Sequence, residues 1–360
     1  MSFYDDHIAN AYWQDRFYTI AAGNADTIAV KNDGSVYKTG ATNLGGADSQ
    51  WVDIIQVAFG FQHAVALKSD GTVFAAGTST GGRTNVSTWN DVVQIATSSA
   101  GTLGLKADGT VFSAGTFNVG AIDTSEWTGV IQVAGGGNHA VGLKFDGTAV
   151  GVGLNSAGQI NLSGWNDIIQ IAAGSIKTYG LKSDGTVIFA GSSDQNTSAV
   201  SQWTEIHQIS VYHDTVLGLK TDGTVVVATT SSSGEQNASG WVDIVAVAAG
   251  SQHVVGLKTD GTLVGEGNAG NNRINFSGWV DITTEPTYLI EGKTAIEGVD
   301  QEMEIALHHA TTKRLIRTAQ SAPDGTYSWR VSKRWPVYVT AYADGHKPET
   351  HGPILPPAGV

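Results

Sequence analysis

The hydrophobic positions of this chain fall in short runs rich in Val, Ile, Leu and Ala, separated by Gly, Asn, Asp and Ser. Short apolar runs bounded by turn residues predict β-strands. We find no window in which apolar residues recur at the three- and four-residue spacing of an amphipathic helix. We therefore expect an all-β array, whose strands are apolar on both faces and lie between neighbours on either side.

The array is a tandem repeat. Eight tryptophans recur every 38 residues, and an Asp-Gly pair stands between each two of them. The tryptophans are Trp13, Trp51, Trp89, Trp127, Trp165, Trp203, Trp241 and Trp279. The Asp-Gly pair predicts a tight hairpin whose central residues both have positive φ. A unit of this length cannot bury its own apolar faces, so the seven units predict a seven-bladed β-propeller with tryptophans packed between the blades. The partial eighth unit, residues 279–282, should close the ring against the first blade.

Composition changes near residue 286. All 7 prolines lie beyond residue 285, and that segment contains equal numbers of acidic and basic residues, so the net charge of −13 belongs to residues 1–285. Strand-like runs at residues 288–290, 303–307, 315–318, 327–331 and 337–342 predict a small β-sandwich. We expect two domains, a propeller at 1–285 and a C-terminal sandwich at 286–360.

Several classes of chemistry are excluded. The absence of Cys excludes disulfides, thiolate metal sites and a cysteine nucleophile. The acidic charge, without a Lys/Arg cluster in the repeats, argues against nucleic-acid binding. We expect no cleavable signal peptide and no membrane span.

The repeated polar residues are interpreted as structural. His63, His139 and His253 share one position in the repeat, and other blades place Asp26, Gly101, Lys177 and Thr215 there, so no ring of ligands forms. His308 and His309 are neighbours on a strand and point to opposite faces. The hairpin aspartates lack a calcium-binding pattern, and a second column of acids follows the tryptophans. That column is Asp53, Asp91, Asp167, Asp243 and Asp281. We predict no catalytic residue, no cofactor and no metal, although carboxylates from different blades could still converge as in a glycosidase.

Binding is expected where the repeat varies. One set of variable residues is the polar loop before each tryptophan. The other follows each Ala-Gly, where some blades place large side chains instead of Gly, Ser or Asn. In the C-terminal segment, basic residues cluster beside apolar strands and suit docking on a neighbouring subunit. The candidate partner-contact residues are Phe59, Phe61, Ile176, Lys177, Tyr212, His213, Lys313, Arg314, Arg317, Arg330, Lys333 and Arg334.

The unit His-x-Val-x-Leu-Lys-x-Asp-Gly-Thr-Val, seen at residues 63–77, 139–153 and 253–267, resembles the regulator-of-chromosome-condensation repeat, a family of seven-bladed propellers. It is similar to the short bacterial and phage variety and lacks the inserted wedge of the eukaryotic exchange factor, so nucleotide exchange is not expected. The C-terminal segment, with Asp324-Gly325-Thr326-Tyr327, resembles the carboxypeptidase-regulatory, transthyretin-like or fibronectin-like sandwich found on tailed-phage virion proteins.

These resemblances imply a non-enzymatic structural or accessory protein of a tailed-phage virion, in the tail or fibre apparatus or as a capsid decoration. Its partners would be other virion proteins, and possible host-surface glycans or proteins, with several copies in a symmetric assembly. The propeller would be presented and the sandwich would dock. The alternative is a cellular or surface recognition propeller that binds glycan or protein.

Overall fold

The computed structural model describes residues 19–116 and 122–282 in full, and describes the strands between residues 287 and 354 by their backbone pairing. The chain divides into two compact units. One comprises residues 16–284, and the other contains residues 285–360.

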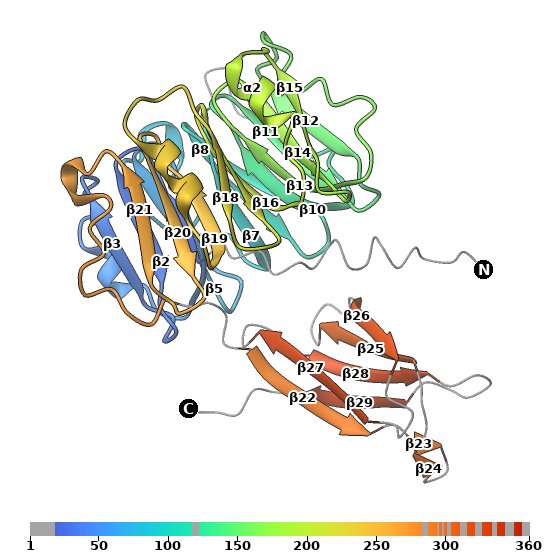
Figure 1. The fold of residues 1–360 in the computed structure, drawn as a ribbon. Helices are drawn as coiled ribbons and strands as arrows, with labels where there is room; N and C mark the ends of the chain where they lie inside the picture. Colours follow the sequence, from blue (N-terminus) through green and yellow to red (C-terminus); the bar gives the residue numbers. More distant parts are fainter. Residues whose placement is uncertain are drawn as a thin grey trace. The chain divides into compact units, whose positions relative to one another are not determined.

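The first unit contains seven three-stranded antiparallel sheets, the blades, which follow one another in chain order (Figure 1). Blades 1 and 2 comprise β1 (Ile20–Ala22), β2 (Asp26–Val30) and β3 (Val36–Gly40), then β4 (Ile54–Phe59), β5 (His63–Lys68) and β6 (Val73–Gly77). Blades 3 and 4 comprise β7 (Val92–Thr97), β8 (Gly101–Lys106) and β9 (Val111–Gly115), then β10 (Val130–Gly135), β11 (His139–Lys144) and β12 (Ala149–Gly153). Blades 5 and 6 comprise β13 (Ile168–Ala173), β14 (Lys177–Lys182) and β15 (Val187–Gly191), then β16 (Ile206–Tyr212), β17 (Thr215–Lys220) and β18 (Val225–Ala228). Blade 7 comprises β19 (Ile244–Ala249), β20 (His253–Lys258) and β21 (Leu263–Gly267). The predicted seven-bladed propeller is confirmed.

The variable loops between blades contain short helical segments. These are η1 (Ala47–Gln50), η2 (Thr80–Gly82), α2 (Gln195–Val200), η3 (Glu235–Gly240) and η4 (Gly270–Asn272). Only α2 has a side-chain N-cap: the Asp194 carboxylate accepts a hydrogen bond from the Thr197 amide, and the Thr197 hydroxyl accepts one from the Asp194 amide. The loops therefore add little regular structure to an all-β scaffold.

Each blade packs on the next through the tryptophan that precedes its inner strand. Trp165 lies in one apolar cluster with Val141 and Leu143 of the preceding blade. Its ring also covers Gly180 of its own middle strand, where an added Cβ would lie 2.7 Å from the ring. The glycine in the repeated Gly-Leu-Lys therefore makes room for the tryptophan, and the predicted packing between blades is confirmed.

The hairpins between middle and outer strands differ from the prediction in one respect. Only the glycine has positive φ, for example +78° at Gly147. Asp146 instead accepts hydrogen bonds from the amide and hydroxyl of Thr148, at 2.9 and 2.6 Å. The turn is therefore a β-turn followed by a left-handed glycine, and the aspartate is selected for its side-chain hydrogen bonds.

The acids that follow the tryptophans are also structural, but through their backbone. Asp53, Asp91 and Asp167 have φ of 58°, 56° and 57°. The Asp167 carbonyl accepts a hydrogen bond from the amide of Ser183 at 2.9 Å. Gly129 occupies the same position in blade 4 with φ of 66°, so the site requires a left-handed residue, which Asp tolerates better than most.

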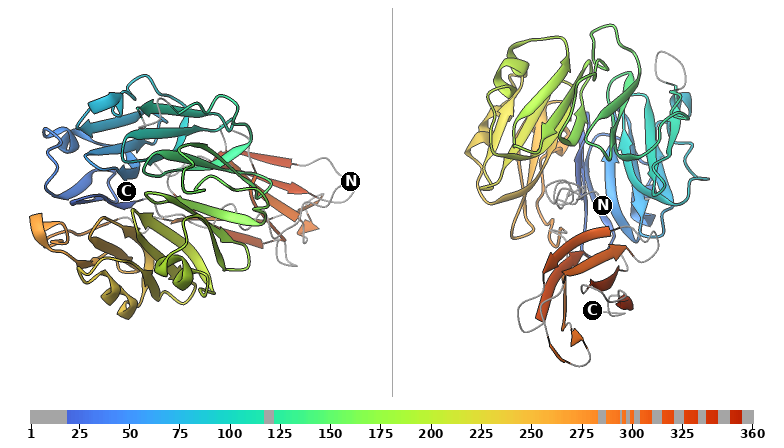
Figure 2. Two further views of the ribbon diagram at one scale, coloured as in Figure 1. Left: turned by 90° about the horizontal axis from the view of Figure 1, so that it is seen from above. Right: turned by 90° about the vertical axis from the view of Figure 1, so that its right-hand side faces the viewer.

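The ring closes through the last partial unit, as predicted. Ile282 pairs with Lys31 of blade 1, as Ile54 pairs with Lys68 inside blade 2. The ring of Trp279 stacks on Tyr37 at 5.1 Å. Blade 1, in blue, lies beside blade 7, in orange (Figure 1, Figure 2). Residues 279–282 therefore complete blade 1, while Trp13 lies outside the described residues.

In the second unit the strands are β22 (Thr287–Lys293), β23 (Ala295–Ile296), β24 (Val299–Asp300), β25 (Glu304–His309), β26 (Leu315–Gln320), β27 (Thr326–Ser332), β28 (Val337–Tyr342) and β29 (Glu349–Ile354). β25 lies between β26 and β28, β29 pairs with β28, and β22 pairs with β27. All of these pairings are antiparallel. The β-sandwich remains a prediction.

Candidate functional site

The variable residues that follow Ala-Gly lie on one face of the propeller. Because inner, middle and outer strands are antiparallel, the turns between inner and middle strands lie opposite the Asp-Gly hairpins. We call the first side the loop face, formed by residues 23–25, 60–62, 98–100, 136–138, 174–176, 213–214 and 250–252. Phe61 is 37% exposed there and Ile176 is 41% exposed. The fold therefore brings candidate contact residues from blades 2 and 5 to the same side.

The inner strands surround a central channel with a cavity of about 180 Å³. Its wall is small and apolar, with Ala58, Ala96 and Ala134 at corresponding positions of successive blades. Two residues further along each inner strand, most blades have Gly or Ser, whereas blade 6 has Tyr212. One large side chain can lie in the channel because the corresponding residues of the other blades are small.

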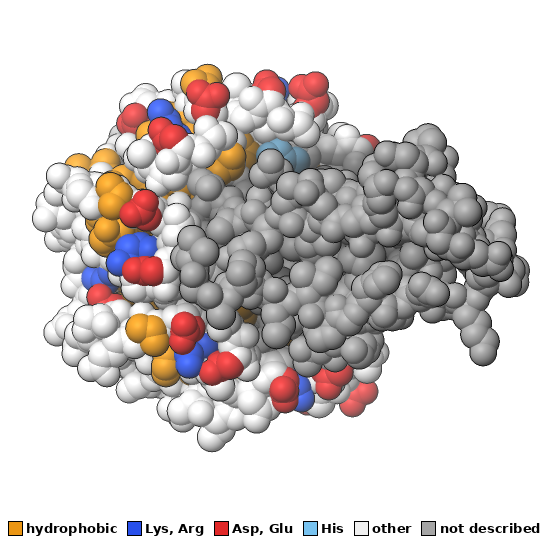
Figure 3. Space-filling view, turned by 90° about the horizontal axis from the view of Figure 1, so that it is seen from below, with side chains coloured by type: hydrophobic (Ala, Val, Ile, Leu, Met, Phe, Trp, Pro, Cys, Tyr) orange, Lys and Arg blue, Asp and Glu red, His pale blue; other side chains and the backbone are white. Residues whose placement is uncertain are grey.

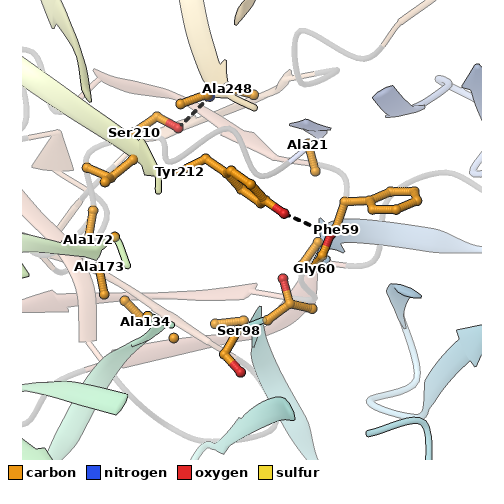
Figure 4. Close-up of a pocket in the computed structure, with 18 of the residues that line it drawn as sticks. Ala21, Phe59, Gly60, Ser98, Ala134, Ala172, Ala173, Ser210, Tyr212 and Ala248 are labelled. Carbon is orange, nitrogen blue, oxygen red and sulfur yellow. Dashed lines mark hydrogen bonds between the residues drawn. The ribbon is translucent and has the colours of Figure 1, made fainter. Parts of the chain in front are cut away.

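Tyr212 extends from blade 6 across the channel (Figure 4). Its hydroxyl donates a hydrogen bond of 3.3 Å to the carbonyl of Gly60 in blade 2. Its ring stacks on His213, with centroids 4.6 Å apart. Burial raises the pKa of the Tyr212 hydroxyl, and the negative charge of Asp26 raises it further. Tyr212 therefore remains neutral and narrows the channel at the loop face.

The wall of the channel contains a belt of glutamines that the sequence analysis did not identify. Gln132 donates to the carbonyl of Ile171 at 3.0 Å and accepts from its amide at 2.9 Å, so it bridges blades 4 and 5. The same bridge recurs between other blades. Gln56, Gln94, Gln132 and Gln170 form this bridge, and Gln208 accepts a hydrogen bond from the amide of Val247 at 3.2 Å. Their constant position, five residues after five consecutive tryptophans from Trp51 to Trp203, was the available signal.

Lys177 is buried between blades 5 and 6, so its expected role as a contact residue is corrected. Its ammonium group lies 2.5 Å from the carboxylate of Asp194 and 3.4 Å from that of Asp214. Burial raises the pKa of the neighbouring Tyr179 hydroxyl, and both carboxylates add to this effect. Lys177 occupies the repeat position of the histidines and joins two blades through ion pairs. The partly exposed Asp194 and Asp214 are the acidic groups beside it on the loop face.

The prediction that Phe59 contacts a partner is also wrong. Its side chain is buried in the apolar cluster between blades 1 and 2, and it lies against Gly23 of blade 1. It therefore offers no surface to a partner. Arg317 and Arg330 lie in β26 and β27, whose side chains are not described. Lys313, Arg314, Lys333 and Arg334 lie outside the described residues.

The repeated histidines connect blades, which agrees with their interpretation as structural residues. The Nε2 atoms of His63 and His139 lie 3.1 and 3.0 Å from the hydroxyls of Thr102 and Thr178 in the next blade. His253 contacts Thr27 in the same way, across the closure of the ring. Burial lowers the histidine pKa values to about 3 for His63 and about 4 for the other two. In the folded protein at neutral pH, they are therefore uncharged residues that bond neighbouring blades to each other.

Within residues 19–116 and 122–282, no three His, Asp or Glu side chains converge closely enough to hold a metal ion. The same part of the chain contains no helix long and apolar enough to cross a membrane.

Comparisons with known proteins agree with this fold. The profile of the regulator of chromosome condensation (RCC1) repeat matches residues 54–83 and 130–159, in blades 2 and 4. A search of the curated proteins finds no match. Two similar solved structures are human WBSCR16 (20% identity, 68% of this chain and 88% of that one, TM-score 0.52) and the CRINKLY WD40 ectodomain of the Arabidopsis thaliana receptor kinase ACR4 (17%, 69% and 94%, 0.53). A third is the entire ectodomain of the Physcomitrella patens receptor kinase CR4 (12%, 87% and 87%, 0.52).

These likenesses concern the fold, because the identities are low. Residues 19–282 therefore form a seven-bladed β-propeller of three-stranded blades, in which blades 2 and 4 match the regulator-of-chromosome-condensation repeat.

Proposed function

We propose that this propeller is a non-enzymatic scaffold that binds another protein through its loop face. The observation that carries the proposal is the exposure of Phe61 and Ile176 at positions where most other blades have small or polar residues. Exposed large apolar side chains on a rigid scaffold are typical of contact surfaces. The stacked Tyr212 and His213 lie on the same face, at the mouth of the channel.

The rigidity of the scaffold supports this role. Glutamine bridges, histidine–threonine contacts and tryptophan packing join consecutive blades, so the loops are held in place before a partner arrives. A preorganised surface loses less conformational entropy on binding than a mobile one. The partly exposed carboxylates of Asp194 and Asp214, which share the single cation Lys177, give this face acidic character and favour a partner with basic residues beside its apolar ones.

We further propose that the partner is another structural protein of a tailed-phage particle. This finer proposal rests on the resemblance of the repeats to the short phage variety and of the C-terminal segment to the transthyretin-like sandwich of virion proteins. In this proposal the sandwich docks on a neighbouring subunit and the propeller is presented, with several copies per particle.

The test has two stages. A mass-spectrometric inventory of particles from producing cells should contain this chain at a fixed ratio to the structural proteins. The full chain with Phe61→Ser and Ile176→Ser should then recover less of its propeller partner in cross-linking, while Phe145→Ser, an exposed phenylalanine on the opposite side, should not. Absence from particles would overturn the virion proposal and favour a cellular recognition protein. Equal cross-linking by both variants would overturn the loop face as the contact.

A further inference from the structure

A second apolar surface lies on the side of the propeller opposite the loop face. We call this side the hairpin face, formed by the Asp-Gly hairpins and the residues that directly follow each tryptophan. Three of those residues, Val52, Val242 and Val280, are 52%, 55% and 56% exposed. From below, hydrophobic side chains appear beside Lys, Arg, Asp and Glu around the visible rim of the propeller (Figure 3).

The three valines belong to consecutive blades. Val242 precedes blade 7, Val280 belongs to the segment that completes blade 1, and Val52 precedes blade 2. We call this group the valine arc. The corresponding residues of blades 3 to 6 are polar: Asn90, Thr128, Asn166 and Thr204. At this position of the repeat, valine is therefore confined to the blades around the closure of the ring, and the repeat itself does not require it.

The backbone of the valine arc is fixed. The amides of Ser69, Thr259 and Asn32 donate to the carbonyls of Asp53, Asp243 and Asp281, which directly follow the valines, at 2.9, 3.0 and 2.8 Å. Each of these aspartates has φ between 56° and 59°. The valines are thus presented by a hydrogen-bonded backbone, which limits the entropy lost when a partner binds.

The surroundings of the valine arc are acidic. Asp53, Asp243 and Asp281 are exposed beside the valines, and the hairpin acids Asp33 and Asp260 lie between consecutive blades. The Lys31 ammonium group lies 3.5 Å from the Asp33 carboxylate and 5.0 Å from the centre of the Tyr37 ring. Lys258 of the next hairpin is half-buried. The basic groups are therefore fewer and less accessible than the acidic ones.

We propose that the valine arc docks a segment of a partner protein that carries aliphatic side chains beside Lys or Arg. Aliphatic groups would cover the valines, and cations would pair with the acids on either side. The proposal goes beyond the loop-face contact, because it places a second contact on the opposite side of the ring. The propeller would then join two proteins.

The test measures fluorescence anisotropy of short labelled peptides with the full chain. A peptide alternating Lys and Val should bind more tightly than one alternating Lys and Ser, and a Glu and Val peptide should not bind. Replacing Val52, Val242 and Val280 together by Ser should weaken binding of the Lys–Val peptide by roughly tenfold or more. Thr128→Ser with Thr204→Ser, at the same position of other blades, should leave it unchanged.

A charge variant checks the second half of the proposal. Asp53→Asn, Asp243→Asn and Asp281→Asn keep a residue that tolerates the left-handed backbone, so the fold should persist. Binding should weaken and depend less on salt. Equal affinity of the wild type for the Lys–Val and Lys–Ser peptides, or full binding by the triple serine variant, would overturn the proposal. A change of oligomeric state in the serine variant without peptide would also overturn it, because the valine arc would then bind a second copy.

Discussion

Single residues of the repeat often have a role that their type alone does not reveal. The histidines lie at a position where a titratable side chain could serve chemistry, yet they are buried against a threonine of the next blade. Burial of a neutral imidazole, with one nitrogen bonded, makes the contact sensitive to protonation. The functional consequence is a pH dependence of stability.

We expect acid to destabilise the propeller through these histidines. An unfolded histidine has a pKa near 6.5, whereas burial lowers the pKa of His63 to about 3 and those of His139 and His253 to about 4. Between these values the unfolded chain binds more protons, so the free energy of unfolding should fall as the pH drops from 6.5 toward 4, by up to about 1.4 kcal/mol per pH unit for each histidine. The hairpin aspartates affect stability at lower pH than the histidines, because hydrogen bonds from Thr72 reduce the pKa of Asp70 to about 2.

Urea unfolding of the full chain at pH 7.5 and pH 5 measures this effect. The variant with His63→Gln, His139→Gln and His253→Gln should lose much less stability between the two pH values than the wild type. Equal losses in both proteins would show that other groups cause the acid sensitivity.

The left-handed turn residues allow a second measurement. Gly147→Ala places a Cβ at φ +78° and 3.2 Å from the Asp167 amide nitrogen, whereas Gly45→Ala has φ +67° and open space. Gly240→Ala meets neither obstacle. We expect losses of stability of about 2 kcal/mol or more, about 1 kcal/mol, and within about 0.5 kcal/mol, in that order. Thermal unfolding gives the ranking, and a neutral Gly147→Ala would contradict the strained turn.

The sequence predicted that the repeated polar residues are structural, but it did not predict which of the large side chains are exposed. Phe61 and Phe59 are two residues apart, and both depart from the repeat, but only Phe61 reaches solvent. Their difference depends on Gly23 of the neighbouring blade, which gives the Phe59 ring its space. That contact joins residues of different repeats, and one repeat read by itself does not contain it.

At the scale of strands, the glutamine belt adds hydrogen bonds between blades to the apolar packing. Apolar runs predicted the inner strands, but the sequence does not show what the buried glutamine within each run bonds to. In the structure a register shift at Ile168 and Gln170 accompanies it, and its amide bonds to the backbone of the next blade. The repeat predicted seven blades, whereas the number of strands in each blade and the bonds between blades required the structure.

Gln132→Ala should therefore destabilise the propeller by about 2 kcal/mol, because it removes two hydrogen bonds to Ile171 in a buried wall. Gln236→Ala, an exposed glutamine in η3, should change stability by less than about 0.5 kcal/mol. The midpoints of urea unfolding compare the two. Equal effects would mean that the belt does not stabilise the contacts between blades.

At the scale of the whole propeller, closure was predictable because a partial eighth unit, residues 279–282, follows the seven complete units. Ile282 belongs to an apolar cluster that includes residues of blades 1 and 7. The contacts in this cluster join the first and last blades of the ring. Loss of the cluster should therefore weaken every blade rather than one end.

Ile282→Asp should lower the free energy of unfolding by roughly 4 kcal/mol or more, since it places a charge in the closure. Val280→Asp, two residues away and exposed, should change it by less than about 0.5 kcal/mol. Calorimetry of the full chain provides the comparison. Similar transitions for the two variants would contradict closure through residues 279–282.

The central claim is that the loop face contacts another virion protein, and site-specific photo-cross-linking tests it most directly. A photoreactive amino acid is placed at position 61, 176 or 145 of the full chain in producing cells, and adducts are identified in purified particles. We predict adducts to a structural protein from positions 61 and 176 and none to that protein from position 145, on the opposite side. Adducts from position 145 alone, or none from the loop face, would contradict the claim.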